Sequence, residues 1–186
     1  MRLCLLLFAA LVLAQPTLTA ADEAVWALLR GGGQVVLMRH AVTTPGVGDP
    51  TGFRLEECST QRNLTDAGRE DARRVGAAFR TRGVPVGRVL SSPWCRCLET
   101  ARLAFGAAAE PWPPLGNLYD NRAREAEQLR ALREIAGRRP TSGNLLLVTH
   151  GSVVRPLTGI QPAPAELVVL TPDNSGHFKL AGRLTP

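Results

Sequence analysis

The sequence predicts an α/β fold, a three-layer sandwich with a mostly parallel central sheet. Apolar runs suited to buried strands alternate along the chain with amphipathic segments at helical spacing, which is typical of parallel sheets covered by helices. Three of these runs also end abruptly in polar residues, as strands do where a ligand binds beyond their carboxyl ends. The chain has 186 residues, enough for one domain of ordinary size.

The first 21 residues have the layout of a secretory signal peptide. Met1-Arg2 is a positive start, residues 3–14 are apolar, and small residues favour cleavage after Ala20 or Ala21. The apolar run is shorter than the roughly 20 residues of a spanning helix, so we expect no stable membrane insertion after cleavage. The expected organisation is a signal peptide at 1–21, one domain at 22–186, and a periplasmic or secreted protein.

The first half of that domain predicts a helix, a strand, a loop and a second helix. Residues 24–30 form a short helix that ends at three glycines, and 34–38 are apolar enough for a strand buried on both faces. Residues 43–60 are predicted to form a long loop, and such loops in compact domains are usually functional or mobile. The second helix has Thr65 or Asp66 as its N-cap and ends near Gly83.

The second half continues the alternation of strands and helices. Its expected elements are a strand at 88–92, a helix at 96–105, an irregular stretch with at most a short strand at 111–118, a helix at 123–136, a buried strand at 144–149, and two edge strands at 167–170 and 177–180. Asp173 and Asn174 mark the turn between the edge strands.

The composition argues against a nucleic-acid partner, and the simplest source of its many arginines is a GC-rich genome, which favours arginine codons. The net charge is +6, and all but one of the 22 cationic residues are arginine. These arginines are scattered, and aromatic residues are few, whereas nucleic-acid binders cluster both kinds of residue in one patch. A basic surface does attract anionic substrates over long range.

Removal of Cys4 with the signal peptide leaves three cysteines. In an exported protein this number predicts one disulfide and one spare thiol. Cys95 and Cys97 are too close to pair with each other, so Cys58 pairs with Cys95 or, as the second choice, with Cys97. We expect the spare thiol to be a small buried residue. No cysteine or histidine pair has the spacing of a zinc site, so no metal is expected.

Three strands end in residues that suit an anion. The first ends in Arg39-His40, the second is followed by Arg96, and the third ends in His150 and Gly151. Parallel strands would bring these groups to one edge, where the arginines could hold a phosphoryl group and a histidine could attack it. Other strand-end residues and flanking side chains are expected to bind the substrate, namely Thr43, Arg62 and Gly151.

With these motifs the chain resembles the histidine phosphatase superfamily, also called the phosphoglycerate mutase-like family. The matching stretches are "LMRHA" at 37–41, "RNLTDAGREDARRVG" at 62–76, "VLSSPWCRCLETA" at 89–101 and "LLLVTHG" at 145–151. The resemblance is closest to the small, single-domain bacterial branch. It implies a phosphoglycerate mutase-like fold and a metal-independent, cofactor-free phosphatase that acts on a small phosphomonoester, phosphohistidine or phosphoanhydride.

The resemblance also implies residue roles. His40 would become a phosphohistidine, while Arg39, Arg96 and His150 would complete the phosphate pocket. Thr100 would support that pocket from the helix at 96–105.

Two positions depart from the family pattern. Ala41 stands where the family usually has glycine, which ordinary backbone angles would tolerate. Asn117 stands where many members have the glutamate that protonates the leaving alcohol, and an amide cannot do so. Asp120 is the expected substitute, with Glu125 as a much weaker candidate, although Asp120 could instead cap the helix at 123–136.

The sequence leaves alternatives open for the function and for several side chains. The missing acid also fits a weak or inactive family member that binds phosphorylated glycans or other anions in the cell envelope. Phosphoglycerate mutase activity is disfavoured by export. Trp94 and Trp112 could line a substrate mouth, although packing is the simpler expectation, and His177 is expected on the surface.

Overall fold

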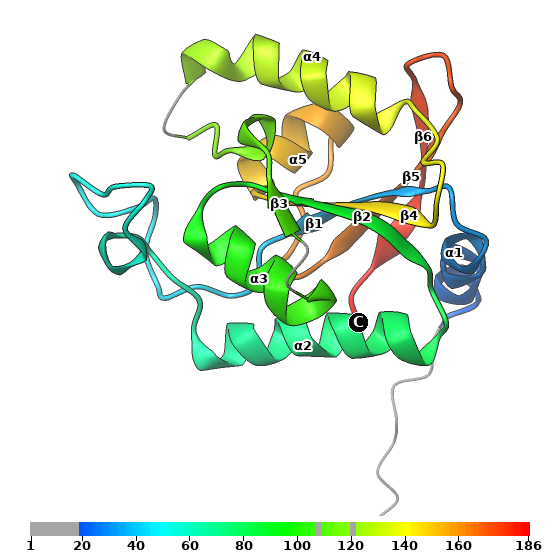
Figure 1. The fold of residues 1–186 in the computed structure, drawn as a ribbon, viewed down its shortest axis with the longest axis horizontal. Helices are drawn as coiled ribbons and strands as arrows, with labels where there is room; N and C mark the ends of the chain where they lie inside the picture. The colour runs from blue at the N-terminus through cyan, green and yellow to red at the C-terminus, as the bar shows by residue number, and fades with distance from the viewer. Residues whose placement is uncertain (1–18, 107–108, 120–121) are drawn as a thin grey trace, which may run out of the picture.

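A six-stranded sheet forms the centre of the molecule in the computed structural model, which describes residues 19–106, 109–119 and 122–186. The strands are β1 (Val35–Arg39), β2 (Val86–Ser91), β3 (Ala109–Pro111), β4 (Asn144–Thr149), β5 (Leu167–Pro172) and β6 (Phe178–Leu184). Their order is β3-β2-β4-β1-β5-β6, and the first four are parallel to one another. Helices cover both faces of the sheet, which confirms the predicted three-layer α/β sandwich (Figure 1).

One prediction about the sheet is wrong: β5 is not an edge strand. It pairs in antiparallel fashion with β1 on one side and with β6 on the other. The turn at Asp173 shows that β5 and β6 are neighbours but not which of them lies outside. The uninterrupted apolar run of β5 suits a position covered on both faces. The last strand also starts one residue later than expected, so His177 lies in the turn.

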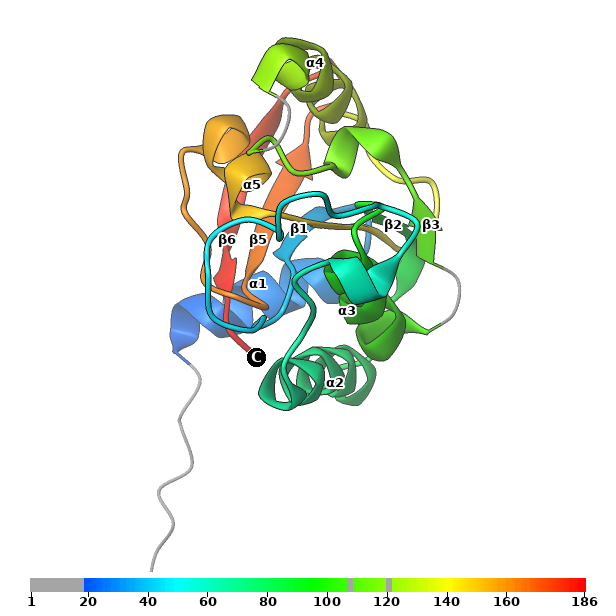
Figure 2. The same cartoon turned by 90° about the vertical axis from the view of Figure 1, so that its left-hand side faces the viewer.

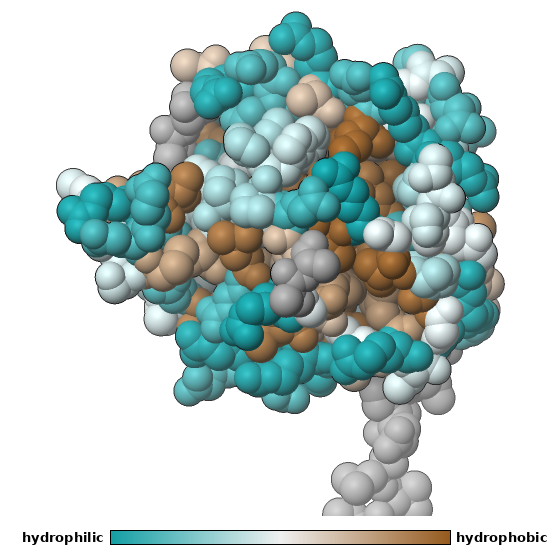
Figure 3. Space-filling view, in the orientation of Figure 1, coloured by the Kyte–Doolittle hydropathy of each residue, from teal (hydrophilic) through white to brown (hydrophobic). Residues whose placement is uncertain are grey.

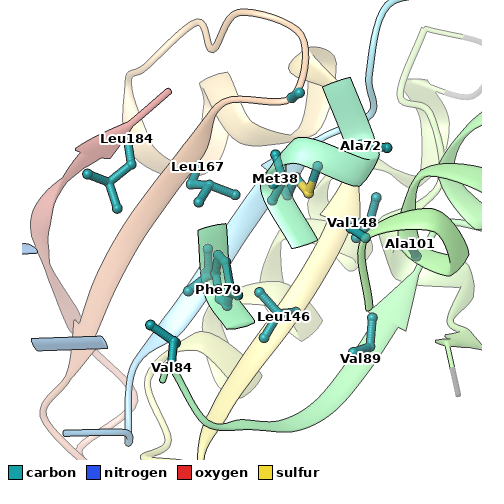
Figure 4. Packing of buried hydrophobic residues seen from close by; sticks show 14 of the residues in the cluster. Met38, Ala72, Phe79, Val84, Val89, Ala101, Leu146, Val148, Leu167 and Leu184 are labelled. Atoms are coloured by element: carbon teal, nitrogen blue, oxygen red, sulfur yellow. The ribbon is translucent and has the colours of Figure 1, made fainter. Parts of the chain in front are cut away.

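The helices divide between the two faces of the sheet. On one face lie α1 (Ala20–Arg30), α2 (Asp66–Thr81) and α3 (Cys95–Phe105), and on the other lie α4 (Glu125–Ala136) and α5 (Gly151–Thr158). In Figure 4, Phe79 of α2 packs toward Met38 and Leu146 of the sheet. The alternation of strand side chains between the two cores follows from the two-residue repeat of a strand.

Threonine caps begin the first two helices. The Thr65 side chain accepts a hydrogen bond from the Gly68 amide, which confirms one of the two expected caps of α2. Thr19 forms a capping box with Asp22, so α1 begins earlier than expected. Cleavage after Ala20 or Ala21 would remove Thr19. Most of the expected signal peptide, residues 1–18, lies outside the described residues.

The sequence pattern does not predict the helix α5. Pro156 lies inside it, and the β-branched Val153 and Val154 lower its intrinsic helix propensity. Burial of its apolar side against the sheet outweighs these costs. Gly159 ends the helix in the left-handed conformation, at φ 78°.

Two glycines of α2 allow close contact with neighbouring backbones. A Cβ on Gly76 would lie 2.0 Å from the Ala104 carbonyl oxygen, where α2 meets α3. A Cβ on Gly68 would lie 2.0 Å from the Val42 carbonyl oxygen. The start of α2 therefore packs directly on the chain that leaves β1.

The carboxyl ends of the parallel strands face the viewer in Figure 2, and the cyan segment that follows β1 crosses in front of them. The same segment is the mostly hydrophilic projection in Figure 3. Within the described ranges, none of the helices is long and apolar enough to cross a bilayer.

Candidate active site

A cavity of 690 Å³ lies beyond the carboxyl ends of β1 and β4. It brings together Arg39, His40, Arg96 and His150, which were predicted from the strand ends, and Arg62, which was predicted as a substrate-binding residue. These five residues are called the base of the cavity. Gly151 also lines the cavity, as expected.

His40 directly follows β1 and is 4% exposed. Its amide donates to the Thr149 carbonyl (2.9 Å), and its ring Nδ1 lies 2.8 Å from the Ala41 carbonyl oxygen. Because a carbonyl can only accept, Nδ1 carries the proton and Nε2 carries the lone pair. Burial, with a smaller contribution from nearby arginines, lowers the pKa of His40 to about 3 even though the Ala41 hydrogen bond opposes the shift. The ring is therefore a neutral base at ordinary pH.

Thr100 ties the backbone beside His40 to α3. Its hydroxyl accepts from the Ala41 amide (3.1 Å) and donates to the Arg96 carbonyl (2.7 Å). Ala41 is fully buried and is not among the residues with positive φ. The ordinary backbone at Ala41 explains why a methyl group fits where the family usually has glycine.

His150 follows β4 and faces His40, with ring centroids 5.4 Å apart. Nδ1 lies 3.5 Å from the Arg96 guanidinium and Nε2 lies 2.8 Å from Ser92 Oγ. Because a guanidinium can only donate, Nδ1 accepts and Nε2 donates to the serine. Burial, followed by the charges of His40 and the arginines, lowers the pKa of His150 well below its usual value. The second imidazole is therefore also neutral.

Arg96 forms a fully buried ion pair with Asp49. Arg96 Nη1 and Asp49 Oδ1 are 2.7 Å apart, and the two side chains are 1% and 0% exposed. Asp49 also accepts from Trp94 Nε1 (3.1 Å) and the Arg62 amide (2.9 Å). Burial alone would raise the pKa of Asp49, but the hydrogen bond from Arg96 and the others outweigh it and lower the pKa. An ionised Asp49 fixes Arg96, and no sequence motif marks this aspartate.

The other two arginines of the base are held by the main chain and a hydroxyl. Arg39 donates to the Pro162 carbonyl (2.8 Å), and Arg62 donates to Thr43 Oγ1 (2.7 Å) and the Gly46 carbonyl (3.1 Å). Thr43 therefore contacts Arg62 and is not among the cavity-lining residues. Burial and the neighbouring arginine charge lower the pKa values of both Arg39 and Arg62.

Arg39, Arg62 and Arg96 share one further property. The Nε–H of each is buried and has no hydrogen-bond partner among the described residues. Buried donors of this kind are costly unless they are satisfied. Three guanidinium groups that repel one another around one cavity match the chemistry of a tetrahedral oxyanion, which would accept from several of them.

A disulfide joins Cys58 to Cys95, which confirms the first choice of pairing. It ties the loop after β1 to the start of α3, next to Arg96. Cys97 is the spare thiol; it is fully buried, 3.5 Å from the His150 ring. Burial raises its pKa to about 12, which suits packing and not nucleophilic attack.

The opposite side of the cavity carries the Asn117 region. Asn117 is buried, and its Oδ1 accepts from the Ser152 hydroxyl (2.7 Å) and the Tyr119 amide (3.2 Å). Asp120 lies outside the described residues. Glu125, the weaker candidate for the acid, does line the cavity, and Arg124 occupies the N-cap of α4 without a side-chain cap.

Four residues here are called the mouth of the cavity: Tyr119, Arg122, Glu125 and Arg155.

The remaining candidates lie outside the cavity lining. Trp94 packs beside Phe53 and His150, and Trp112 packs against the core between the sheet and α4. His177 is exposed, as expected. Over the described part of the chain, no three His, Cys, Asp or Glu side chains group as metal ligands.

The sequence profile of the histidine phosphatase superfamily (branch 1) matches residues 35–129. The chain belongs to the histidine phosphatase superfamily. The matched range contains four of the five residues of the base, while His150 follows it. No curated protein gives a match to this chain.

Solved structures of phosphatases share the superfamily fold with this chain. The protein histidine phosphatase SixA, complexed with tungstate, is 24% identical, covers 82% of this chain and 97% of its own, and has a TM-score of 0.54. A phosphoserine phosphatase from Entamoeba histolytica with 3-phosphoglyceric acid is 14% identical, with coverage of 82% and 97% and a TM-score of 0.60. The ecdysone phosphate phosphatase from Bombyx mori, with tungstate, is 15% identical, with coverage of 82% and 92% and a TM-score of 0.56.

Proposed function

We propose that the protein is a phosphatase that transfers a phosphoryl group from its substrate to His40 and then to water. The observation that carries the proposal is the unprotonated Nε2 of His40 in the same cavity as the guanidinium groups of Arg39, Arg62 and Arg96. Membership of the superfamily supports it. So does tungstate, a tetrahedral oxyanion like phosphate, in two structures of the same fold.

In the proposed first step, His40 Nε2 attacks phosphorus and the bond from phosphorus to the leaving group breaks. Arg39, Arg62 and Arg96 stabilise the charge on the phosphoryl oxygens, which is the main catalytic task in phosphoryl transfer. In the second step water attacks the phosphohistidine, the P–N bond breaks, and inorganic phosphate leaves. The chemistry needs His40 neutral at the start, which its low pKa provides.

The nature of the leaving group follows from Asn117. Its amide replaces the carboxylic acid that would protonate an alcohol, and its Oδ1 is already bound by Ser152. We therefore propose substrates whose leaving group departs with little help, such as a phosphohistidine or a phosphoanhydride, ahead of simple alkyl phosphomonoesters. A series of aryl phosphates tests this idea, since kcat should fall steeply as the pKa of the leaving phenol rises.

We also propose that the protein acts outside the cytoplasm, because residues 1–21 have the layout of a secretory signal peptide. A small phosphorylated molecule is the expected partner, with no nucleic acid and no membrane insertion. Mass spectrometry of the N-terminus of the protein recovered from its native cell tests this directly. Recovery of an intact Met1 from the cytoplasm would contradict it.

The decisive experiment uses p-nitrophenyl phosphate in EDTA with wild type, His40→Ala and, as a matched control, His177→Ala. We expect hydrolysis and an acid-labile phosphoenzyme in wild type and the control, and a loss of at least about a thousandfold in His40→Ala.

Each failure points to a different error. An inactive wild type across pH 4–8 that still binds tungstate would favour the anion-binding, non-catalytic alternative. Activity that survives His40→Ala would remove the phosphohistidine mechanism.

A further inference from the structure

The cavity extends well beyond the base. Its volume of 690 Å³ is several times that of a phosphoryl group, and among the described residues its lining includes five arginines and one carboxylate, Glu125. Three of the arginines belong to the base. The other two, Arg122 and Arg155, are exposed at the mouth and form no ion pair within the described residues. The mouth therefore adds positive charge that the transferred phosphoryl group does not require.

The helix α5 sets the distance between the two cationic regions. Its first residue, Gly151, lies at the base, because a Cβ on Gly151 would be 3.6 Å from Arg39 Nε. Arg155 follows four residues later, which is about one helical turn and roughly 6 Å along the axis on the same side. Both residues line the cavity.

Gln161 adds a polar donor at the base end of this helix. Its Nε2 lies only 2.6 Å from the position that a Gly151 Cβ would take. Gln161 therefore places an amide donor near Arg39 and Gly151 at the base.

We propose that the substrate carries a second anionic group, a phosphate or a carboxylate, which Arg155 and Arg122 bind roughly 6 Å or more from the transferred phosphoryl group. This rests on the proposed function, since it takes the phosphoryl group to lie over His40. The substrate class is thus a compound with two anionic groups separated by a short spacer. Arginine suits both kinds of anion because its planar fork donates two hydrogen bonds to either.

A different use of the same charge would be long-range attraction of any anion. Attraction of that kind raises the affinity for all anionic ligands in similar proportion and weakens with salt. A binding subsite acts only on ligands that reach it. The two uses therefore separate when matched ligands with one and two anionic groups are compared.

The experiment measures binding by calorimetry to His40→Ala, which does not depend on turnover. The ligands are bisphosphates of propanediol, butanediol and hexanediol, each compared with the monophosphate of the same diol. The matching phosphono-carboxylates test a carboxylate as the second anionic group. We expect at least one bisphosphate to bind about tenfold or more tightly than its monophosphate, beyond the factor of two from its two equivalent ends. Arg155→Gln in the same background should reduce that ratio to about two.

Arg102→Gln is the matched control. Arg102 is an exposed arginine on α3 that does not line the cavity, so this variant removes one charge elsewhere. Equal affinities for one and two anionic groups, or an equal loss for both in Arg155→Gln, would overturn the subsite. A catalytically inactive wild type with the binding preference intact would instead remove the proposed function and leave the subsite in place.

Discussion

The base and the mouth of the cavity are built in opposite ways. Every side chain at the base is buried or half-buried, and two of its arginines are held by bonds to distant parts of the chain, Arg96 by Asp49 and Arg39 by Pro162. At the mouth, Tyr119 is 62% exposed and Arg155 is also exposed. The proposed chemistry thus lies on buried groups at the strand ends, while the proposed second set of substrate contacts comes from exposed side chains.

The largest effect is expected where the base is most deeply buried. Arg96→Leu leaves the Asp49 carboxylate buried and unpaired, so unfolding free energy in urea should fall by about 3–5 kcal/mol. The rate kcat should fall by about a hundredfold or more. Arg88→Leu, in an ion pair whose two side chains are 55% and 56% exposed, should cost less than about 1 kcal/mol.

The double variant Arg96→Leu with Asp49→Asn separates the two losses. It should recover much of the stability and none of the activity. If it is as unstable as the single variant, the unpaired Asp49 carboxylate is not the cause of the lost stability.

Removal of the disulfide tests whether the geometry of the base depends on the covalent link between Cys58 and Cys95. It closes a sequence separation of 37 residues, so Cys58→Ser with Cys95→Ser should lower the unfolding free energy by about 2–4 kcal/mol. We also expect a lower kcat, because the loop that carries Asp49 is no longer tied to α3. Cys97→Ala is the control for loss of a cysteine, and an unchanged unfolding midpoint in the double variant would contradict the bracing role.

The low pKa of His40 makes the stability of the protein depend on pH. The pKa of His40 falls from its usual 6.5 to about 3 on folding, so between these values the unfolded chain binds more protons than the folded one. Stability therefore falls as pH decreases, by about 2 kcal/mol between pH 7 and pH 5 from this residue. Urea unfolding of wild type and His40→Asn measures it. Equal slopes with pH in both proteins would show that His40 does not carry the effect.

The smallest effect is expected at the mouth. Glu125→Gln should change stability by less than about 0.5 kcal/mol, because Glu125 is partly exposed. It should slow alkyl phosphate hydrolysis less than about tenfold, with Glu127→Gln as the neighbouring control. A loss of about a hundredfold or more would identify Glu125 as the general acid and would place chemistry at the mouth as well.

The sequence predicts most of the base and little of the mouth. Arg39, His40 and His150 could be found because they directly follow apolar strands, and strand direction alone brings them to one edge. The small number of thiols limited the partners of Cys58 to Cys95 and Cys97, and the first choice, Cys95, is the one observed. These predictions depend on local pattern and on one rule of topology.

What could not be predicted depends on tertiary packing. Asp49 sits in a loop without periodicity, and only the folded chain places it against Arg96. The inner position of β5 depends on which side of a hairpin meets β1, and α5 forms in spite of Pro156. The role of Asp120 as proton donor remains a prediction, because this residue lies outside the described part of the chain.

The bond from Arg39 to the Pro162 carbonyl spans 123 residues, and it has a consequence for how the chain folds. His40 is likewise tied to Thr149, far along the chain. Contacts between such distant residues form late, because closing long loops must precede them. In partly folded chains, β4 and residues 160–166 have not yet packed in place, so the base of the cavity is incomplete and cannot bind an anion. Phosphate or tungstate should therefore slow unfolding without speeding the early steps of folding, since only the finished molecule can bind it.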